Sequence, residues 1–520
     1  MFRKCLLIFL SITGLLSFRA SANNIDVTNL GLSDQNTSSD YTMVSFDISW
    51  DNSWRTGSAP NNWDAAWVFV KYREQGSTTW YHATLNTSGH TAPSGSTIDT
   101  PSDGKGVFIY RSSNGTGTFS LTGVELQWDY GTDGLADDAM VEVRVYAIEM
   151  VYVPQGAFAL GSGGTENGAF YKYPTTTDTY SVASEGAITV GTASGNLYYP
   201  STAYSGDQSG PIPAAFPKGY AAFYCMKYEV SQEQYVAFLN TLTRTQQNTR
   251  TQTNVSGTSI TDVYVMGPSP STTVQYRNGI RCDATLPASP TPITFYCDYN
   301  GNGTGDESDD GQNITCNFLS SNDLKAYLDW SGLRPFTELE FEKACRGTAS
   351  PVANERAWGT TSYASSAYTL SNAGSANEGI ATNYSTTAGN VTFSSTNGSI
   401  VGPLRQGIFA ANGSNTGRVT SGATYYGIME MSGNVWEKAV TVGEATGRAY
   451  TGAQGDGTLN ASGDADVTNW PATDCVGMGF RGGDRVNGSS SLRVSDRGVA
   501  VYSATYRDTH VGGRGVRTAP

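Results

Sequence analysis

The chain has 520 residues, of which 32 are basic and 46 acidic, and its formal net charge is −14. An acidic surface repels nucleic acids and anionic lipids, so a nucleic-acid partner is not expected. The 60 glycines and 30 tyrosines, with only 15% charged residues, indicate a β-rich and loop-rich globular protein and exclude a helical bundle or a disordered chain. This length also indicates more than one domain.

Residues 1–22 have the pattern of a signal peptide. Arg3 and Lys4 precede an apolar run that ends at Leu16, and the sequence ASA at residues 20–22 matches an A-x-A cleavage site. The run is too short to span a membrane, and no later stretch approaches the required length. The sequence therefore predicts a protein without a membrane span that is secreted, periplasmic or on the cell surface.

An all-β domain is predicted for residues 23–149. Short runs rich in β-branched and aromatic residues alternate there with clusters of Gly, Asn, Ser and Pro. These runs are 41–50, 65–74, 106–111, 117–128 and 139–150. In the last run Val141, Val143 and Val145 recur with a period of two, which gives one buried face. The pattern predicts a two-sheet sandwich.

Three tryptophans of this domain leave two interpretations open. If Trp50, Trp54 and Trp63 are exposed, their rings could stack on sugars and bind carbohydrate. If they are buried or lie at sheet edges, they are ordinary structural aromatics, and this second interpretation is favoured.

Residues 150–520 have a different character, with a few helices among long loops. Helical spacing of apolar residues predicts helices within 229–242, 318–330 and 337–346. Ser231 is the expected N-cap of the first, and Thr337 with Glu340 forms a capping box for the third. Residues 360–425 are rich in Ser, Thr, Gly and Asn, and are either a linker or a long ordered loop region held by metal. The predicted class is α+β.

The segment 297–316 reads CDYNGNGTGDESDDGQNITC and concentrates carboxylates between two cysteines. It fits the twelve-residue calcium loop D-x-[DN]-x-[DN]-G, with Gly303 at the sharp turn. The alternative is a flexible, solvated acidic turn. A structural Ca²⁺ is favoured, and its predicted ligands are Asp298, Asn300, Asn302, Thr304, Asp306 and Asp309, at positions one, three, five, seven, nine and twelve.

Cys297 and Cys316 bracket this loop and are predicted to form a disulfide. A bond closing a loop of this length would stabilise the fold by roughly 3 kcal/mol in the chain-entropy model. Two separate buried thiols are the alternative, since six cysteines outside the leader allow 15 pairings.

Six motifs occur in an order that resembles the sulfatase-modifying-factor family, the formylglycine-generating-enzyme domain. They are YVPQGAFALGS, YEVSQEQYVAFLN, LRPFTELEFEKACRG, GIMEMSGNVWEKA, FRGGD and GGRGVR, spread over roughly residues 150–520. The resemblance implies a variant of the C-type-lectin fold. The fold expected for the whole chain is therefore a C-type-lectin-like formylglycine-generating-enzyme fold preceded by an all-β sandwich.

The resemblance also implies a calcium site in the motif MEMSGNVWEKA. The family ligates calcium at the positions that match Glu430, Gly433, Val435 and Glu437 of this chain. Hard cations prefer such mixtures of carboxylate and carbonyl oxygens. Trp436 lies between these ligands and is expected to fill the core.

The copper chemistry of the family is not expected here. The family holds copper(I) with two cysteines, and the matching positions in this chain are Asn487 and Leu492. Copper(I) selects soft thiolates, which an amide and an isobutyl group cannot replace. His82, His90 and His510 are too dispersed for a two-histidine iron site, and the Gly-rich stretches lack a phosphate loop. We expect no copper, haem or nucleotide.

Three functions remain open at this point. The first is a non-catalytic, calcium-stabilised binding or cell-envelope protein with a protein or glycan partner. The second is an enzyme with different chemistry around Arg493, Asp496 and Arg497, although these charges could equally form an ion-paired rim. The third is a carbohydrate-binding protein.

Overall fold

The computed structural model describes residues 25–267 and 271–520, so the predicted signal peptide lies outside the described part of the chain. The described chain divides into two compact units. The first contains the residues up to Arg55 together with Trp63–Glu149, and the second contains Thr56–Asn62 and Met150–Ala519.

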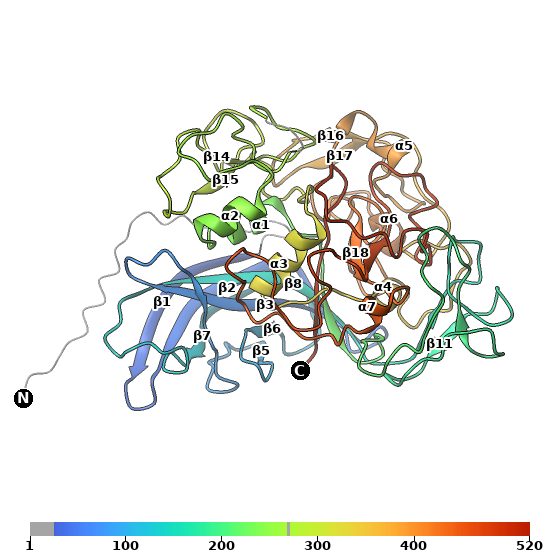
Figure 1. The fold of residues 1–520 in the computed structure, drawn as a ribbon, viewed down its shortest axis with the longest axis horizontal. Coiled ribbons are helices and arrows are strands. Elements are labelled where there is room, and N and C mark those ends of the chain that lie inside the picture. Colours follow the sequence, from blue (N-terminus) through green and yellow to red (C-terminus); the bar gives the residue numbers. More distant parts are fainter. Residues whose placement is uncertain (1–24, 268–270) are drawn as a thin grey trace, which may run out of the picture. The chain divides into compact units, whose positions relative to one another are not determined.

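The first unit consists of strands that form two sheets around one apolar core (Figure 1). One sheet has the order β1-β2-β7, and in the other β8, β3, β6 and β5 are neighbours, with β4 paired to β3. The strands are β1 (Asp26–Asn36), β2 (Tyr41–Arg55), β3 (Asp64–Glu74), β4 (Tyr81–His82), β5 (Ser96–Asp99), β6 (Val107–Arg111), β7 (Gly115–Trp128) and β8 (Val141–Val153). Inward side chains of both sheets, among them Phe46, Val68 and Leu126, build the shared core.

All five runs predicted as strands in this unit are confirmed, as β2, β3, β6, β7 and β8. The period-two pattern of β8 is also confirmed, because Val141, Val143 and Val145 all pack against the core. The sequence did not reveal β1, which is polar and interrupted. Its register on β2 shifts between Thr28 and Gly31, and again between Ser33 and Asn36.

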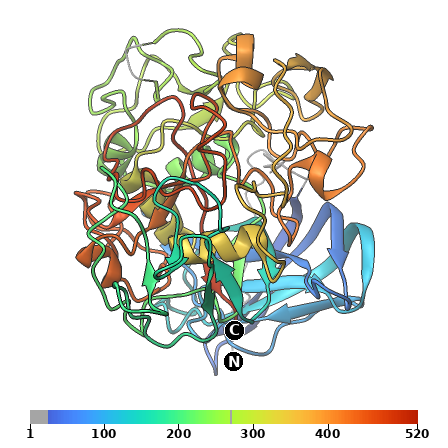
Figure 2. The ribbon, with the colours of Figure 1, turned by 90° about the vertical axis from the view of Figure 1, so that its right-hand side faces the viewer.

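The second unit is mostly loop, with short strands and few helices (Figure 2). Its strands are β9 (Phe158–Leu160), β10 (Tyr171–Lys172), β11 (Tyr180–Val182), β12 (Leu197–Tyr198), β13 (Phe223–Met226), β14 (Ile280–Cys282), β15 (Phe295–Cys297), β16 (Thr369–Ser371), β17 (Gly379–Thr382), β18 (Glu437–Val440), β19 (Met478–Arg481) and β20 (Val516–Thr518). Its helices are α1 (Gln232–Leu239), α2 (Arg244–Arg250), α3 (Ser321–Trp330), α4 (Glu338–Arg346), α5 (Ser394–Asn397), the 3-10 turn η1 (Gly398–Ile400), α6 (Arg418–Ser421) and α7 (Ala445–Arg448).

The ends of the second unit meet in one sheet. β13 pairs antiparallel with the last four residues of β8 on one side and with β20 on the other. The sheet therefore joins the first and last segments of the unit through a central strand.

The three predicted helices are confirmed as α1, α3 and α4, and Ser231 caps α1 as expected. Residues 360–425 are ordered, because Tyr368, Ile380, Leu404 and Ile408 pack in one apolar cluster. The linker interpretation of this segment is therefore wrong. Within the described residues, no helix combines the length and the apolar character needed to cross a bilayer.

Candidate metal centre

A tight turn precedes β18 and lies against a buried carboxylate, that of Glu229. Glu430, Gly433 and Asn434 all have left-handed backbone angles, with φ of 55°, 86° and 66°. A Cβ on Gly433 would lie 2.3 Å from the carbonyl oxygen of Thr392, so only glycine fits there. The Asn434 side chain fixes the turn, because its Oδ1 accepts from the Leu404 amide at 2.8 Å.

Trp436 lies in the apolar core beside this turn, as predicted. Its ring stacks on Phe480 at a centroid distance of 5.5 Å, and Ala504 and Val511 complete the cluster. The residues on either side of Trp436 are thus held against the core, which fixes the direction of their polar groups.

Three buried glutamates surround the turn. Glu229 accepts from the Val435 amide at 3.1 Å and from Asn434 Nδ2 at 2.6 Å. Glu430 accepts from the Gly407 amide at 2.9 Å through Oε1, and Glu437 accepts from Arg514 Nε at 2.5 Å through Oε1.

The negative charge of these carboxylates exceeds the positive charge that contacts them. Arg514 is the guanidinium that pairs directly with the group, through Glu437. Burial raises the pKa of Glu430 to about 7, raises the pKa of Glu437, and raises that of Glu229 well above its ordinary value. The site therefore favours any additional cation.

Two carboxylate oxygens of the site have no hydrogen-bond partner among the described residues. They are Oε2 of Glu430 and Oε2 of Glu437, and both are buried. Leaving a buried acceptor unsatisfied costs about 1–3 kcal/mol, and more for a charged group. Among the described residues, no backbone amide donates to the carbonyl oxygens of Gly433 and Val435. These four residues thus offer the mixture of hard oxygens that fits Ca²⁺.

Several predicted ligands of the 297–316 loop make ion pairs or hydrogen bonds within the protein. The Asp298 carboxylate pairs with Arg281 and accepts from the amides of Gly301 and Gly303. Asp306 accepts through Oδ1 from the amide of Cys297 at 3.0 Å.

The amide side chains of the same loop act as donors to carboxylates. Asn300 Nδ2 donates to Asp309 at 3.1 Å, and Asn302 Nδ2 donates to Glu307 at 2.5 Å. The amide of Thr304 bonds to Asn302 Oδ1 at 2.7 Å. An arginine thus neutralises the carboxylate that the calcium-loop pattern assigns to position one.

The predicted disulfide between Cys297 and Cys316 is absent, and both are free, buried thiols. Burial raises the pKa of both thiols, which keeps them protonated and unreactive. The Sγ atom of Cys316 instead lies 3.9 Å from Asn278 Nδ2. The alternative of two separate thiols describes the structure.

The side chains at the two positions that the resemblance assigns to copper ligands, Asn487 and Leu492, make structural contacts. Leu492 is 0% exposed and packs in an apolar cluster with Trp358, Val391 and Phe393. Asn487 donates from Nδ2 to Asp484 at 2.8 Å. His510 lies beside the same carboxylate, with its Nε2 3.7 Å from Asp484.

Of the three charges proposed for an alternative enzyme, Arg497 belongs to a buried ion-pair network, whereas Arg493 and Asp496 are half-buried. Arg497 donates to both carboxylate oxygens of Glu338, at 2.6 and 2.9 Å, and is fully buried. Arg481 bridges Glu338 and Glu342. Asp496 accepts from the Gly498 amide at 3.1 Å. Arg497 is therefore a structural residue, although the network is buried and does not form the predicted rim.

Trp50 and Trp63 of the first unit are held in structural contacts, which agrees with the favoured interpretation, and Trp54 is half-buried. Trp50 is 1% exposed and donates to Asp64 at 3.0 Å. Trp63 stacks on Tyr110 at 5.4 Å, with the Arg55 guanidinium 4.7 Å from its ring. A cavity of about 380 Å³ lies elsewhere in this unit, and its lining includes Leu30, Gln35, Tyr130, Asp137 and Met140.

Sequence reasoning missed Glu229 and Arg514 at the turn. Each lies in a motif quoted for the family resemblance, YEVSQEQYVAFLN and GGRGVR, but no local pattern gave them a role. A glutamate flanked by apolar residues in KYEVS was the available signal for Glu229, because an unpaired carboxylate is rarely buried.

Comparison with known proteins gives one family. Residues 138–519 match the family described as sulfatase-modifying factor enzyme 1-like domain. No curated protein matches the chain.

Proposed function

The chain belongs to the sulfatase-modifying factor family, and from this premise we propose that it is an exported, calcium-stabilised member without oxidase activity. It acts as a binding or cell-envelope protein and uses no copper, haem or nucleotide. The position of Leu492 carries the proposal, since an isobutyl group packed among aromatic rings stands where the resemblance requires a thiolate.

Calcium has a structural role in this proposal. Glu430, Gly433, Val435 and Glu437 would hold it, which would satisfy the two unpartnered carboxylate oxygens. The ion would supply positive charge to an over-acidic interior and would activate no substrate. The pairing of β13 with both β8 and β20 supports the C-type-lectin-like fold proposed for the second unit, since it brings the two ends of the unit together.

The cavity of the first unit supports the binding role. Its volume, about 380 Å³, lies in the range of small-molecule sites, and it combines apolar side chains with a few polar groups. Tyr130 donates its hydroxyl to Asp137 at 2.8 Å, and Gln35 donates to the Asp137 carbonyl at 2.7 Å. A neutral, hydroxyl-rich ligand such as a glycan suits this lining.

The test is an oxidase assay on the full chain. Purified protein loaded with copper(I) is incubated in air with a cysteine-containing sulfatase peptide, and the aldehyde is measured by mass spectrometry. We expect no aldehyde and no retained copper. A matched double variant, N487C with L492C, should retain copper and show that the loading works. Aldehyde formation by the wild-type protein would refute the proposal.

A further inference from the structure

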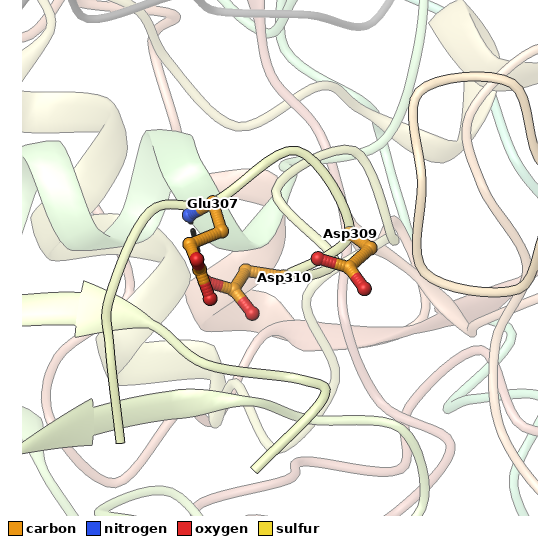
Figure 3. A group of neighbouring side chains, drawn as sticks. All are labelled: Glu307, Asp309 and Asp310. Atoms are coloured by element: carbon orange, nitrogen blue, oxygen red, sulfur yellow. Dashed lines mark hydrogen bonds between the residues drawn. The ribbon is translucent and has the colours of Figure 1, made fainter. Parts of the chain in front are cut away.

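Three carboxylates of the 297–316 loop meet in one group, of which the calcium-loop pattern includes only Asp309. Glu307, Asp309 and Asp310 each direct a carboxylate oxygen into one group, in which all three atoms lie within 4.8 Å of one another (Figure 3). Among the described residues, no lysine or arginine forms an ion pair with any of the three. Like charges at this separation repel unless a cation lies between them.

Asp310 provides an independent reason to expect a ligand. This residue is 0% exposed, and its Oδ1 is buried without a hydrogen-bond partner in the part of the chain that the structure describes. Its other oxygen, Oδ2, accepts from the Glu307 amide at 2.7 Å, which fixes the carboxylate beside the group. A buried and unsatisfied carboxylate oxygen is a ready ligand for a metal ion.

The group can accommodate one calcium ion. Its three oxygens lie within 4.8 Å of one another, a separation that one ion with calcium–oxygen distances of about 2.4 Å can span. Calcium accepts irregular coordination completed by water, whereas Mg²⁺ demands a regular octahedron. Asp309 is exposed, which leaves room for those waters.

We propose that Glu307, Asp309 and Asp310 bind one Ca²⁺, and that Asp298 and Asp306 do not ligate it. Asp298 is already neutralised by Arg281, and Asp306 holds the Cys297 amide. Three carboxylates supplemented by water resemble extracellular sites, whose dissociation constants are about 10⁻⁴ to 10⁻³ M. This site is separate from the turn at Gly433 and does not depend on the proposed function.

Binding would fix the loop to two neighbouring segments. The Gly311 amide donates to the Gly374 carbonyl at 2.8 Å, beside the β16–β17 hairpin. Gln312 donates from Nε2 to the Glu307 carbonyl at 2.5 Å, and its own carbonyl accepts from the Glu233 amide of α1 at 3.1 Å. Calcium should therefore protect residues 298–316 from proteolysis.

The experiment compares variants of the full chain by equilibrium dialysis against calcium chloride and by limited proteolysis of the loop. We expect E307Q and D309N to weaken calcium binding at one site by about tenfold or more and to expose the loop to protease. D306N is the matched control, because an asparagine keeps the oxygen that accepts from Cys297, and it should bind like the wild type. D310N tests the buried ligand by the same binding measurement. If D310N fails to fold, D309N still tests the site, because Asp309 is exposed.

Two results would overturn the proposal. One is loss of binding in D306N or D298N with wild-type binding in E307Q, which would restore the calcium-loop pattern. The other is unchanged binding in all of them. Repeating the dialysis in an E430Q background removes the other proposed site, at the Gly433 turn. The number of calcium ions bound per chain then shows which of the two sites fails.

Discussion

Asp329 carries a carboxylate in the interior without a cationic partner among the described residues. It lies in α3 and is fully buried, and its two oxygens accept from the amides of Asp456 and Asp466 at 3.0 and 3.2 Å. Burial, together with the charge of the Asp456 and Asp466 side chains, raises its pKa to about 7. The native state therefore holds this proton more tightly than the unfolded chain does.

This difference sets the direction of a pH dependence. The carboxyl titrates near 3.9 when unfolded and near 7 when folded, so between these values the native state binds more protons. Stability should fall as the pH rises from about 4 to about 7, by at most about 1.4 kcal/mol per pH unit from this group. D329N should remove that part of the slope, although the amide leaves one backbone donor unpaired.

Urea unfolding at a series of pH values, in chelator, measures the slope. The exposed Asp178 supplies the matched control D178N, which should follow the wild-type profile. A D329N profile parallel to the wild type would show that Asp329 does not titrate in this range.

The sequence predicted the roles of some residues at the Gly433 turn and not of others. Gly433 and Trp436 were predictable, since a turn needs glycine and a large aromatic beside it fills the core. Arg514 and Glu229 were not, because they meet the turn from 77 or more positions away in the chain. Charge pairing over such distances leaves no periodic signal in the sequence.

α4 shows how a local pattern defines an element. Thr337 Oγ1 accepts from the Glu340 amide at 3.1 Å, and Glu340 accepts from the Thr337 amide at 2.9 Å. The hydroxyl of the same threonine donates to the Pro217 carbonyl at 2.9 Å. Arg334 donates to both carboxylate oxygens of Glu340. The predicted capping box is confirmed, and its threonine also connects the start of the helix to Pro217, which lies far away in the sequence.

Removing this cap should destabilise the protein measurably. T337A loses the bond to the helix amide and leaves the Pro217 carbonyl without its donor, so we expect a loss of about 2 kcal/mol in the free energy of unfolding. T337S keeps the hydroxyl and should lose much less. Chemical denaturation followed by circular dichroism measures both, and equal stability of T337A and wild type would contradict the role of the cap.

Elements without a hydrophobic period escaped prediction. α2 has the sequence RTQQNTR, and it is held by polar contacts such as the bonds from Gln247 Nε2 to the carbonyls of Leu239 and Ile293. Tertiary hydrogen bonds of this kind decide the conformation of a segment whose own propensity is weak. The strands with apolar alternation and the three capped apolar helices were predictable for the opposite reason.

Calcium should affect the melting of the whole molecule. If the turn at Gly433 binds calcium, a concentration one hundred times the dissociation constant adds about 2.7 kcal/mol to stability. We expect chelator to lower the melting temperature of the wild type, calcium to restore it, and magnesium to restore it less.

Calorimetry of E430Q provides the comparison, because that variant should melt at a temperature much less sensitive to chelator. The exposed Glu74 gives the matched control E74Q, which should respond as the wild type does. A wild-type protein that melts at the same temperature with and without chelator would contradict calcium stabilisation.

At the scale of the whole chain, the order of six motifs identified the family, and alternating runs identified the strands of the first unit. Of the three carboxylates that converge in the acidic loop, the calcium-loop pattern includes Asp309 but not Glu307 or Asp310. Asp298, which the pattern also includes, pairs with Arg281 of the adjacent strand β14. A linear pattern contains no information about such a competitor.

The burial of Leu492 also restricts how the protein can change. Replacing it with cysteine alone would open a void among Trp358, Val391 and Phe393. A large-to-small change of this kind in a core lowers the free energy of unfolding by about a few kcal/mol. One thiol would still lack its companion at residue 487. On the proposed function, gaining a metal-dependent oxidation would thus require two coordinated substitutions, the first of which weakens the fold and creates no metal site.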